Sequence, residues 1–195
     1  MLPRLRPMKS SLTYLAVGAV LLAAPAQVRA DTYTIDPAHS SVSFTIRHDA
    51  LFKLTAGFTR FHGSVILDPD RPLGDTAEVA IEVASLDTHI HARDEDLKSP
   101  HYFDSAKFPL ITFRGRVWRR TGAGTFEVKG DLTIKNVTKE VLLSVKRLDS
   151  PGGGHSWEAT TTLNRKDFGI QGPSVLDKGI SDKLDVAIAV HAVKP

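Results

Sequence analysis

Histidine carries most of the reactive chemistry that this sequence offers. The 195-residue chain has eight histidines and no cysteine. His89 and His91, with Asp94 and His101 nearby, are side chains of the kind that bind zinc or iron. Their spacing is nonspecific, and the His-x-His pair precedes a predicted helix. We therefore interpret these histidines as exposed or hydrogen-bonding residues and predict no metal site.

Two other histidines flank the first alternating segment of the chain. His48 continues the apolar face of that segment, and His39 precedes it. A general acid or base at either position would suit an enzyme, whereas a histidine at the mouth of a pocket would suit a binding protein. The acidic run at 93–96 has similar alternatives: a solvated helix face, a buttress for the helix, or a contact to a polar ligand head.

Several classes of chemistry are excluded by what the sequence lacks. Without cysteine there is no disulfide framework, no thiol nucleophile and no thiolate metal site. No Gly-x-Ser-x-Gly elbow occurs, and the glycines at 152–154 lack the spacing and the following Lys of a phosphate-binding loop. We interpret 152–154 as a hairpin tip.

The charges are unevenly distributed along the chain. Residues 1–30 hold four cations and no acidic residue, so a formal net charge of +3 becomes 21 cations against 22 anions from Asp31 onward. Nucleic-acid binding rests on neutralising phosphates. We therefore expect no nucleic-acid partner.

The first thirty residues have the pattern of a secretory signal. Three cations precede an apolar stretch at 12–24, and Val28 and Ala30 supply small residues at the spacing that signal peptidase accepts. We predict a signal peptide over 1–30, cleaved after Ala30, and one domain over 31–195. A membrane anchor would need about 20 apolar residues. We expect no stable membrane insertion and a bacterial periplasm as the simplest destination.

Apolar and polar residues alternate along nearly all of the remaining chain, which is typical of strands with one buried face. The alternation predicts eight strands, around 41–48, 57–67, 79–83, 111–117, 126–134, 141–145, 157–163 and 184–190. Val117 is expected to share the apolar face of Phe113. Phe58 and Phe61 are three residues apart, so a β-bulge is needed to place both on one face.

The segments between these strands favour tight turns, which implies antiparallel pairing. Helical spacing of Ile90, Asp94 and Leu97 predicts one short helix, Ala92 to Lys98, between the third and fourth strands. Eight strands with one apolar side each form a sandwich or a closed barrel. The periodicity alone does not choose between them.

The order of motifs resembles the YceI-like family of exported proteins, from about Tyr33 to Val190. The residues that carry the resemblance are Tyr33-Thr34-Ile35-Asp36-Pro37-Ala38-His39-Ser40, Ser85-Leu86-Asp87-Thr88, Arg93-Asp94-x-x-Leu97, Tyr102-Phe103-Asp104, Phe108-Pro109-x-Ile111-x-Phe113, Gly130-Asp131-Leu132-Thr133-Ile134 and Asn164-Arg165-x-Asp167-Phe168-Gly169.

The resemblance implies an all-β, eight-stranded antiparallel, lipocalin-like barrel around a long apolar tunnel that holds polyisoprenoid or a similar amphiphilic lipid. It implies periplasmic transport or storage with a link to stress responses, no enzymatic activity, and no cofactor beyond the bound lipid. The segment 49–54 departs from the family's usual pattern and is expected to shape the tunnel entrance. A homodimer stays open.

The alternation then selects the side chains expected to line the tunnel: Val42, Phe44, Ile46, Val79, Ile81, Phe113, Val128, Leu132, Leu143, Val186 and Ile188. Phe58, Phe61 and Phe168 are expected to join them from the bulge and a loop. His48, Arg93 and Asp94 are the candidates for contacts at the polar end.

Three functions remain open from the sequence. The first is a lipid carrier. The second is an enzyme acting on an isoprenoid or quinone-like substrate, with His39 or His48 as general acid or base. The third is a filled barrel that binds a protein partner through its outer surface, and a hollow interior would distinguish the carrier from it.

Overall fold

The computed structural model describes residues 30–48, 52–67, 74–150, 154–173 and 177–195. The predicted signal peptide lies outside these residues, apart from Ala30, and so do residues 49–51 of the expected entrance segment. Within the described ranges, no helix has the length and apolar character needed to cross a bilayer.

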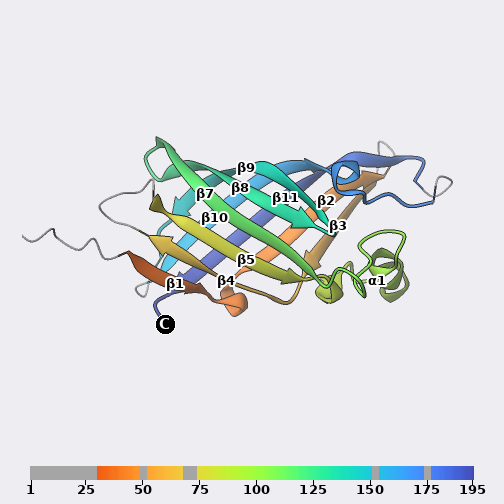
Figure 1. The fold of residues 1–195 in the computed structure, drawn as a ribbon, viewed down its shortest axis with the longest axis horizontal. Coiled ribbons are helices and arrows are strands. Elements are labelled where there is room, and N and C mark those ends of the chain that lie inside the picture. Colours follow the sequence, from red (N-terminus) through yellow and green to blue (C-terminus); the bar gives the residue numbers. More distant parts are fainter. Residues whose placement is uncertain (1–29, 49–51, 68–73, 151–153, 174–176) are drawn as a thin grey trace, which may run out of the picture.

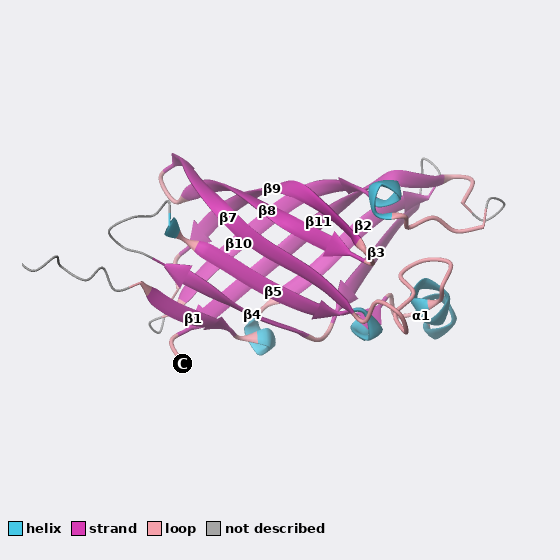
Figure 2. Ribbon diagram, in the orientation of Figure 1, coloured by secondary structure: helices cyan, strands magenta, loops and turns pink. Residues whose placement is uncertain are grey.

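Most of the described chain is β-strand (Figure 2). The strands are β1 (Asp31–Ile35), β2 (Ser41–His48), β3 (Phe52–Phe58), β4 (Phe61–Leu67), β5 (Thr76–Glu82), β6 (Leu86–Asp87), β7 (Leu110–Gly122), β8 (Thr125–Ile134), β9 (Val137–Leu148), β10 (His155–Asn164) and β11 (Ile180–Val193). The helical elements are α1 (His91–Lys98) and the single turns η1 (Pro37–His39), η3 (Val83–Ser85) and η4 (Arg165–Phe168).

The strands form one antiparallel sheet that closes on itself (Figure 1). β1 and β2 lie end to end along β11, with Thr34 paired to Val193 and Val42 paired to Ile188. β4 and β3 continue this arrangement along β1 and β2, and β5 and β6 lie beside them. If each end-to-end pair is taken as one wall strand, the barrel has eight. The predicted eight-stranded antiparallel barrel is confirmed.

An interruption between β3 and β4 places Phe58 and Phe61 on the same face. The Thr59 amide donates to the Ser85 carbonyl at 3.1 Å, and the Arg60 carbonyl accepts from the Glu82 amide at 3.0 Å. These bonds hold two residues outside the strands, and both phenylalanines are buried. The shared face was predicted, but the structure achieves it by a break between two strands where a β-bulge was expected.

A β-bulge does occur in β7, and it corrects the expected direction of Val117. The β7–β8 register shifts between Gly115 and Val117. The extra residue reverses the alternation after that point. Val117 is therefore 52% exposed on the outer wall, and Trp118 is buried inside the barrel.

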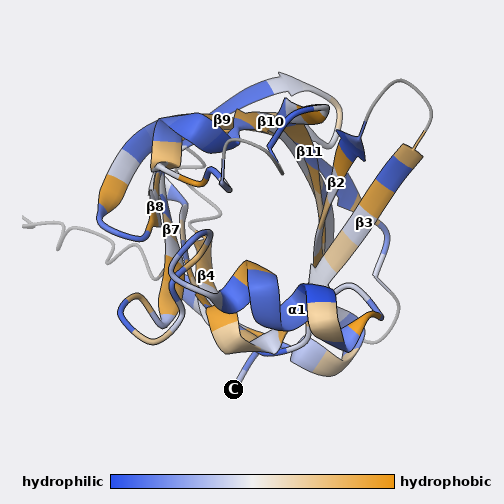
Figure 3. Ribbon diagram, turned by 90° about the vertical axis from the view of Figure 1, so that its right-hand side faces the viewer, coloured by the Kyte–Doolittle hydropathy of each residue, from blue (hydrophilic) through white to orange (hydrophobic). Residues whose placement is uncertain are grey.

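The helix α1 lies at one end of the barrel and begins one residue before the predicted helix. It crosses one side of the ring of strands in the end-on view (Figure 3). Asp94 and Arg93 attach it to the chain after β6, because both side chains bond to Thr88. We call this the α1 end and the opposite one the far end.

The interior contains two apolar clusters. The first, towards the α1 end, includes Phe58, Phe61, Phe103 and Phe168. The second, towards the far end, includes Tyr33, Trp118, Val128, Leu143 and Trp157. The first cluster surrounds a wholly apolar cavity, which defines the candidate site.

Candidate functional site

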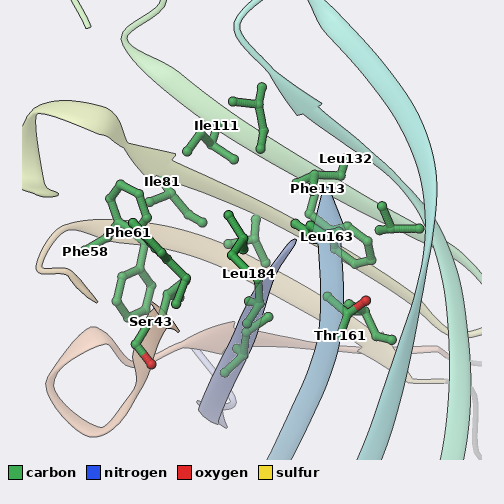
Figure 4. A pocket seen from close by; sticks show the side chains of 18 of the residues that line it. Ser43, Phe58, Phe61, Ile81, Ile111, Phe113, Leu132, Thr161, Leu163 and Leu184 are labelled. Carbon is green, nitrogen blue, oxygen red and sulfur yellow. The ribbon is translucent and has the colours of Figure 1, made fainter. Parts of the chain in front are cut away.

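An apolar cavity of about 130 Å³ occupies the half of the barrel next to α1 (Figure 4). Its lining draws on 24 residues from all eight wall strands and from the chain around η4, and the surface that faces the cavity is apolar. In Figure 4, Phe58, Phe61 and Ile81 lie on one side of the view and Phe113, Leu132 and Leu163 on the other.

Two glycines allow the Phe113 ring to lie against the barrel wall. A Cβ atom on Gly130 would come within 2.6 Å of the Phe113 ring and within 2.5 Å of the Arg114 carbonyl. A Cβ atom on Gly115 would come within 3.3 Å of the same ring. Phe113, Leu143 and Ile188 line the cavity and also pack with the far-end cluster. They therefore form the floor of the cavity.

An arc of aromatic rings forms the wall towards the α1 end. The ring centroids of Phe44 and Phe58 are 6.1 Å apart, and Phe58 meets Phe103 edge to face at 6.3 Å. Phe103 follows α1, and its amide donates to the Leu97 carbonyl at 3.0 Å. The helix segment thus supplies an aromatic side chain to the lining.

Twelve of the seventeen side chains selected from the sequence line this cavity. They are Val42, Phe44, Phe58, Phe61, Val79, Ile81, Phe113, Leu132, Leu143, Phe168, Val186 and Ile188. The structure brings these residues together, and their contact with a ligand stays a prediction.

Two apolar candidates lie elsewhere. Val128 is 1% exposed and packs in the far-end cluster beside Trp118. A separate pocket of about 390 Å³ at that end is lined by Tyr33, Trp118 and Trp157 together with charged residues, and Val128 is not in its lining. Ile46 is buried in β2 outside the lining. The apolar cavity does not reach Val128, and a long tunnel through the barrel stays a prediction.

The three polar candidates are outside the lining as well. His48 is exposed at the end of β2. Asp94 is buried, and its carboxylate accepts from the amide and hydroxyl of Thr88, which lowers the pKa of Asp94. Arg93 donates to the Thr88 hydroxyl and carbonyl, both at 2.9 Å. Arg93 and Asp94 therefore buttress α1, the second of the alternatives considered for 93–96.

Arg165, to which the sequence reasoning gave no individual role, is the one charged residue in the described lining. It is 3% exposed, and its guanidinium donates to Asp177 at 2.6 Å, to Asp182 at 3.3 Å and to the carbonyls of Ile170, Ser181 and Ile180. These bonds occupy the guanidinium and tie η4 to Ile170, to Asp177 and to the start of β11 at the edge of the cavity. The only signal for it was the motif Asn164-Arg165-x-Asp167-Phe168-Gly169.

The candidate acid–base histidines are also away from the cavity. His39 is the exposed last residue of η1, and its Nδ1 lies 2.6 Å from the Asp36 carboxylate. Hydrogen bonds from His39 and from the Ala38 amide lower the pKa of Asp36. Neither His39 nor His48 is in the lining. Among the described residues, no three His, Asp or Glu side chains converge to hold a metal. The cavity wall can bury hydrocarbon but presents no described titratable group other than the bonded Arg165.

Comparisons with known sequences give a consistent result. The sequence profile of a family described as "YceI-like domain" matches residues 33–192. Relatives described as UPF0312 proteins occur in Azotobacter vinelandii, 34% identical over 197 residues covering 96% of this chain and 99% of the relative, and in Vibrio cholerae, 31% identical over 190 residues covering 93% and 98%.

Solved structures share the architecture. BcnA of Burkholderia cenocepacia has a TM-score of 0.76 at 22% identity, covering 82% of this chain and 99% of BcnA. A polyisoprenoid binding domain from Saccharophagus degradans, implicated in plant cell wall breakdown, has a TM-score of 0.63 at 17% identity, covering 84% and 98%. At these identities, the likeness establishes a common fold.

Proposed function

The chain belongs to the YceI-like family, and from this premise we propose that it binds a polyisoprenoid or a similar amphiphilic lipid inside its barrel. The observation that carries the proposal is the apolar cavity beside α1, whose wall has no described catalytic group. The Saccharophagus degradans neighbour, itself a polyisoprenoid binding domain, adds support.

The size of the cavity limits which part of the lipid fits. An engineered apolar cavity of about 150 Å³ in another protein stays dry and takes up benzene. The roughly 130 Å³ here therefore matches about one isoprene unit. Burial of roughly five carbons contributes about 4 kcal/mol before ordering costs. The apolar tail enters first, and a longer chain requires lining side chains to rearrange or continues out at the α1 end.

The setting of this activity is part of the proposal. The protein is exported to a bacterial periplasm by the signal peptide at 1–30 and acts there as a carrier or store of the lipid, with a role in stress. It binds without a catalytic residue and needs no cofactor. The position of His39 and His48 outside the lining supports a binding protein over an enzyme.

Extraction of the natural ligand tests the proposal. The protein is purified from the periplasmic fraction without detergent, and its organic extract is analysed by mass spectrometry. We expect an isoprenoid lipid bound to the folded protein. A lipid-free preparation that also fails to take up labelled polyprenol would contradict the proposal.

Two neighbouring substitutions on β11 provide a matched comparison. Ile188→Asp places a carboxylate against the apolar cavity, where its desolvation opposes a hydrocarbon guest, so lipid loading is lost. Ala187→Asp adds the same group on the exposed outer face and leaves loading unchanged. Val186→Phe keeps the wall apolar but fills the cavity, so lipid loading should be lost here too. This second variant tests the site even if Ile188→Asp fails to fold. Equal loading of all three proteins would refute the cavity as the site.

A further inference from the structure

The apolar face that lines the cavity continues outward along the hairpin of β2 and β3. Phe44 and Phe58 are in the cavity wall. Ile46 and Leu54 pair with each other farther along the hairpin, and Phe52 pairs with His48 at its end. Because side chains alternate across a strand, Phe52 lies on the same face as Phe58. An apolar path therefore leads from the cavity to the end of the hairpin.

Phe52 is unusually exposed for a residue of its type. Its exposed fraction is 66%, the highest among the large apolar side chains described. The hairpin projects at the α1 end of the molecule (Figure 1). Removing such a side chain from water is favourable, so contact with an apolar partner would be stabilising.

The opposite face of the same hairpin is cationic. Arg47 and Lys53 are directly paired across β2 and β3, and both are exposed. Like charges at opposed positions destabilise a strand pair. Neither side chain has an ion pair within the part of the chain that the structure describes. An anionic partner would relieve this repulsion.

A second apolar side chain is held outward at the same end. Ile90 is 51% exposed and immediately precedes α1. The turn before it is fixed by the bonds of Thr88 to Asp94 and Arg93, and His89 adopts a left-handed conformation with φ of 64°. The fold therefore presents Ile90 on an ordered turn.

We propose that the α1 end docks on the surface of an anionic lipid bilayer, with Phe52 inserted among the acyl chains and Arg47 and Lys53 at the headgroups. A bilayer supplies both the hydrocarbon and the negative charge that this hairpin lacks, and its anionic headgroups attract cations near the surface. The purpose of docking, transfer of a lipid along the apolar path, rests on the proposed function. Docking itself does not require a bound lipid.

Co-flotation with vesicles tests this proposal on the mature protein. The vesicles contain phosphatidylglycerol with phosphatidylcholine, or phosphatidylcholine alone, and neither contains isoprenoid. We expect partitioning onto the anionic vesicles at low ionic strength and its loss at high salt. Phe52→Ser lowers the partition coefficient about tenfold, and Arg47→Ser and Lys53→Ser lower it about fivefold each. Ile90→Ser gives a smaller loss.

Two controls on the barrel wall match these changes. Val117→Ser removes an apolar side chain that is 52% exposed on β7, and Lys146→Ser removes an exposed cation on β9. Both leave partitioning unchanged. Circular dichroism and thermal unfolding check that each variant folds, which we expect because all six side chains are exposed.

The outcomes separate docking from lipid carriage. Absence of vesicle binding, equal binding to neutral vesicles, or unchanged binding of Phe52→Ser would each overturn the proposal. Protein that carries isoprenoid but does not float with anionic vesicles refutes docking and leaves the proposed function standing. Protein that floats as expected but never carries isoprenoid refutes the proposed function and leaves docking standing.

Discussion

The contrast between the cavity wall and a densely packed position can be tested by making the same substitution at each. Val128 is 1% exposed and lies in the far-end cluster, whereas Val186 is partly buried and borders the cavity. Val→Ala at the two positions removes the same atoms. We expect Val128→Ala to lower the free energy of unfolding by more than Val186→Ala does.

The expected magnitude follows from the surroundings of each valine. At Val128, loss of two buried methyl-sized groups costs about 1.6 kcal/mol at about 0.8 kcal/mol each. A residual void of roughly 40 Å³ adds about 1 kcal/mol at about 24 cal/mol per Å³. At Val186 the methyl groups already face empty space, so little new void forms and the loss is about 1 kcal/mol or less. The difference is about 1.5 kcal/mol.

Urea unfolding of delipidated protein measures this difference, provided that the m-value stays constant. A bound lipid fills the space beside Val186, so the cost of Val186→Ala should rise towards that of Val128→Ala in loaded protein. Equal losses in the empty protein, or a larger loss for Val186→Ala, would refute the assignment of open space beside Val186 and dense packing around Val128.

Two further predictions concern the barrel wall at Gly130 and the ion pair between Arg165 and Asp177. Gly130→Ala should destabilise by about 1–3 kcal/mol because the added methyl group collides with the Phe113 ring, whereas Gly57→Ala, whose nearest neighbour would be at 3.6 Å, should unfold at nearly the wild-type urea concentration. The hydrogen bond from Arg165 holds the pKa of Asp177 below its usual 3.8, so its stabilisation is present above that value and is lost as the pH falls through the folded pKa. Asp177→Asn should therefore lower the urea midpoint at about pH 7, and its deficit against wild type should shrink as the pH falls below 3.8; a gap of constant size would contradict this role.

The fold was largely predictable because alternation depends on one local property, the burial of one strand face. Prediction from alternation failed at two places, the β-bulge in β7 and the strand β1. The bulge near Val117 reverses the alternation of β7, and nothing in the local sequence marks the reversal. β1 was recognised as part of a motif but not as a strand, because its pairing with β4 and β11 involves residues far away in the sequence.

The candidate lining was predictable for the same reason, but the position of the cavity was not. Val128 and Leu132 have the same alternation on β8, and they differ because aromatic side chains from other strands fill the space beside Val128. The role of Arg165 depends on Asp177, 12 positions later in an irregular segment, and on Asp182, 17 positions later at the start of β11. Periodicity carries no information about such a segment.

The way the barrel closes has a consequence for how the chain acquires its shape. Ser40 and His191 are 151 positions apart and bond to each other where β1 and β2 meet β11. Contacts between such distant positions form slowly because a long loop must be ordered first. The seam between β1, β2 and β11 can join only after synthesis has reached β11, so the barrel of a growing polypeptide stays open until that strand has been made.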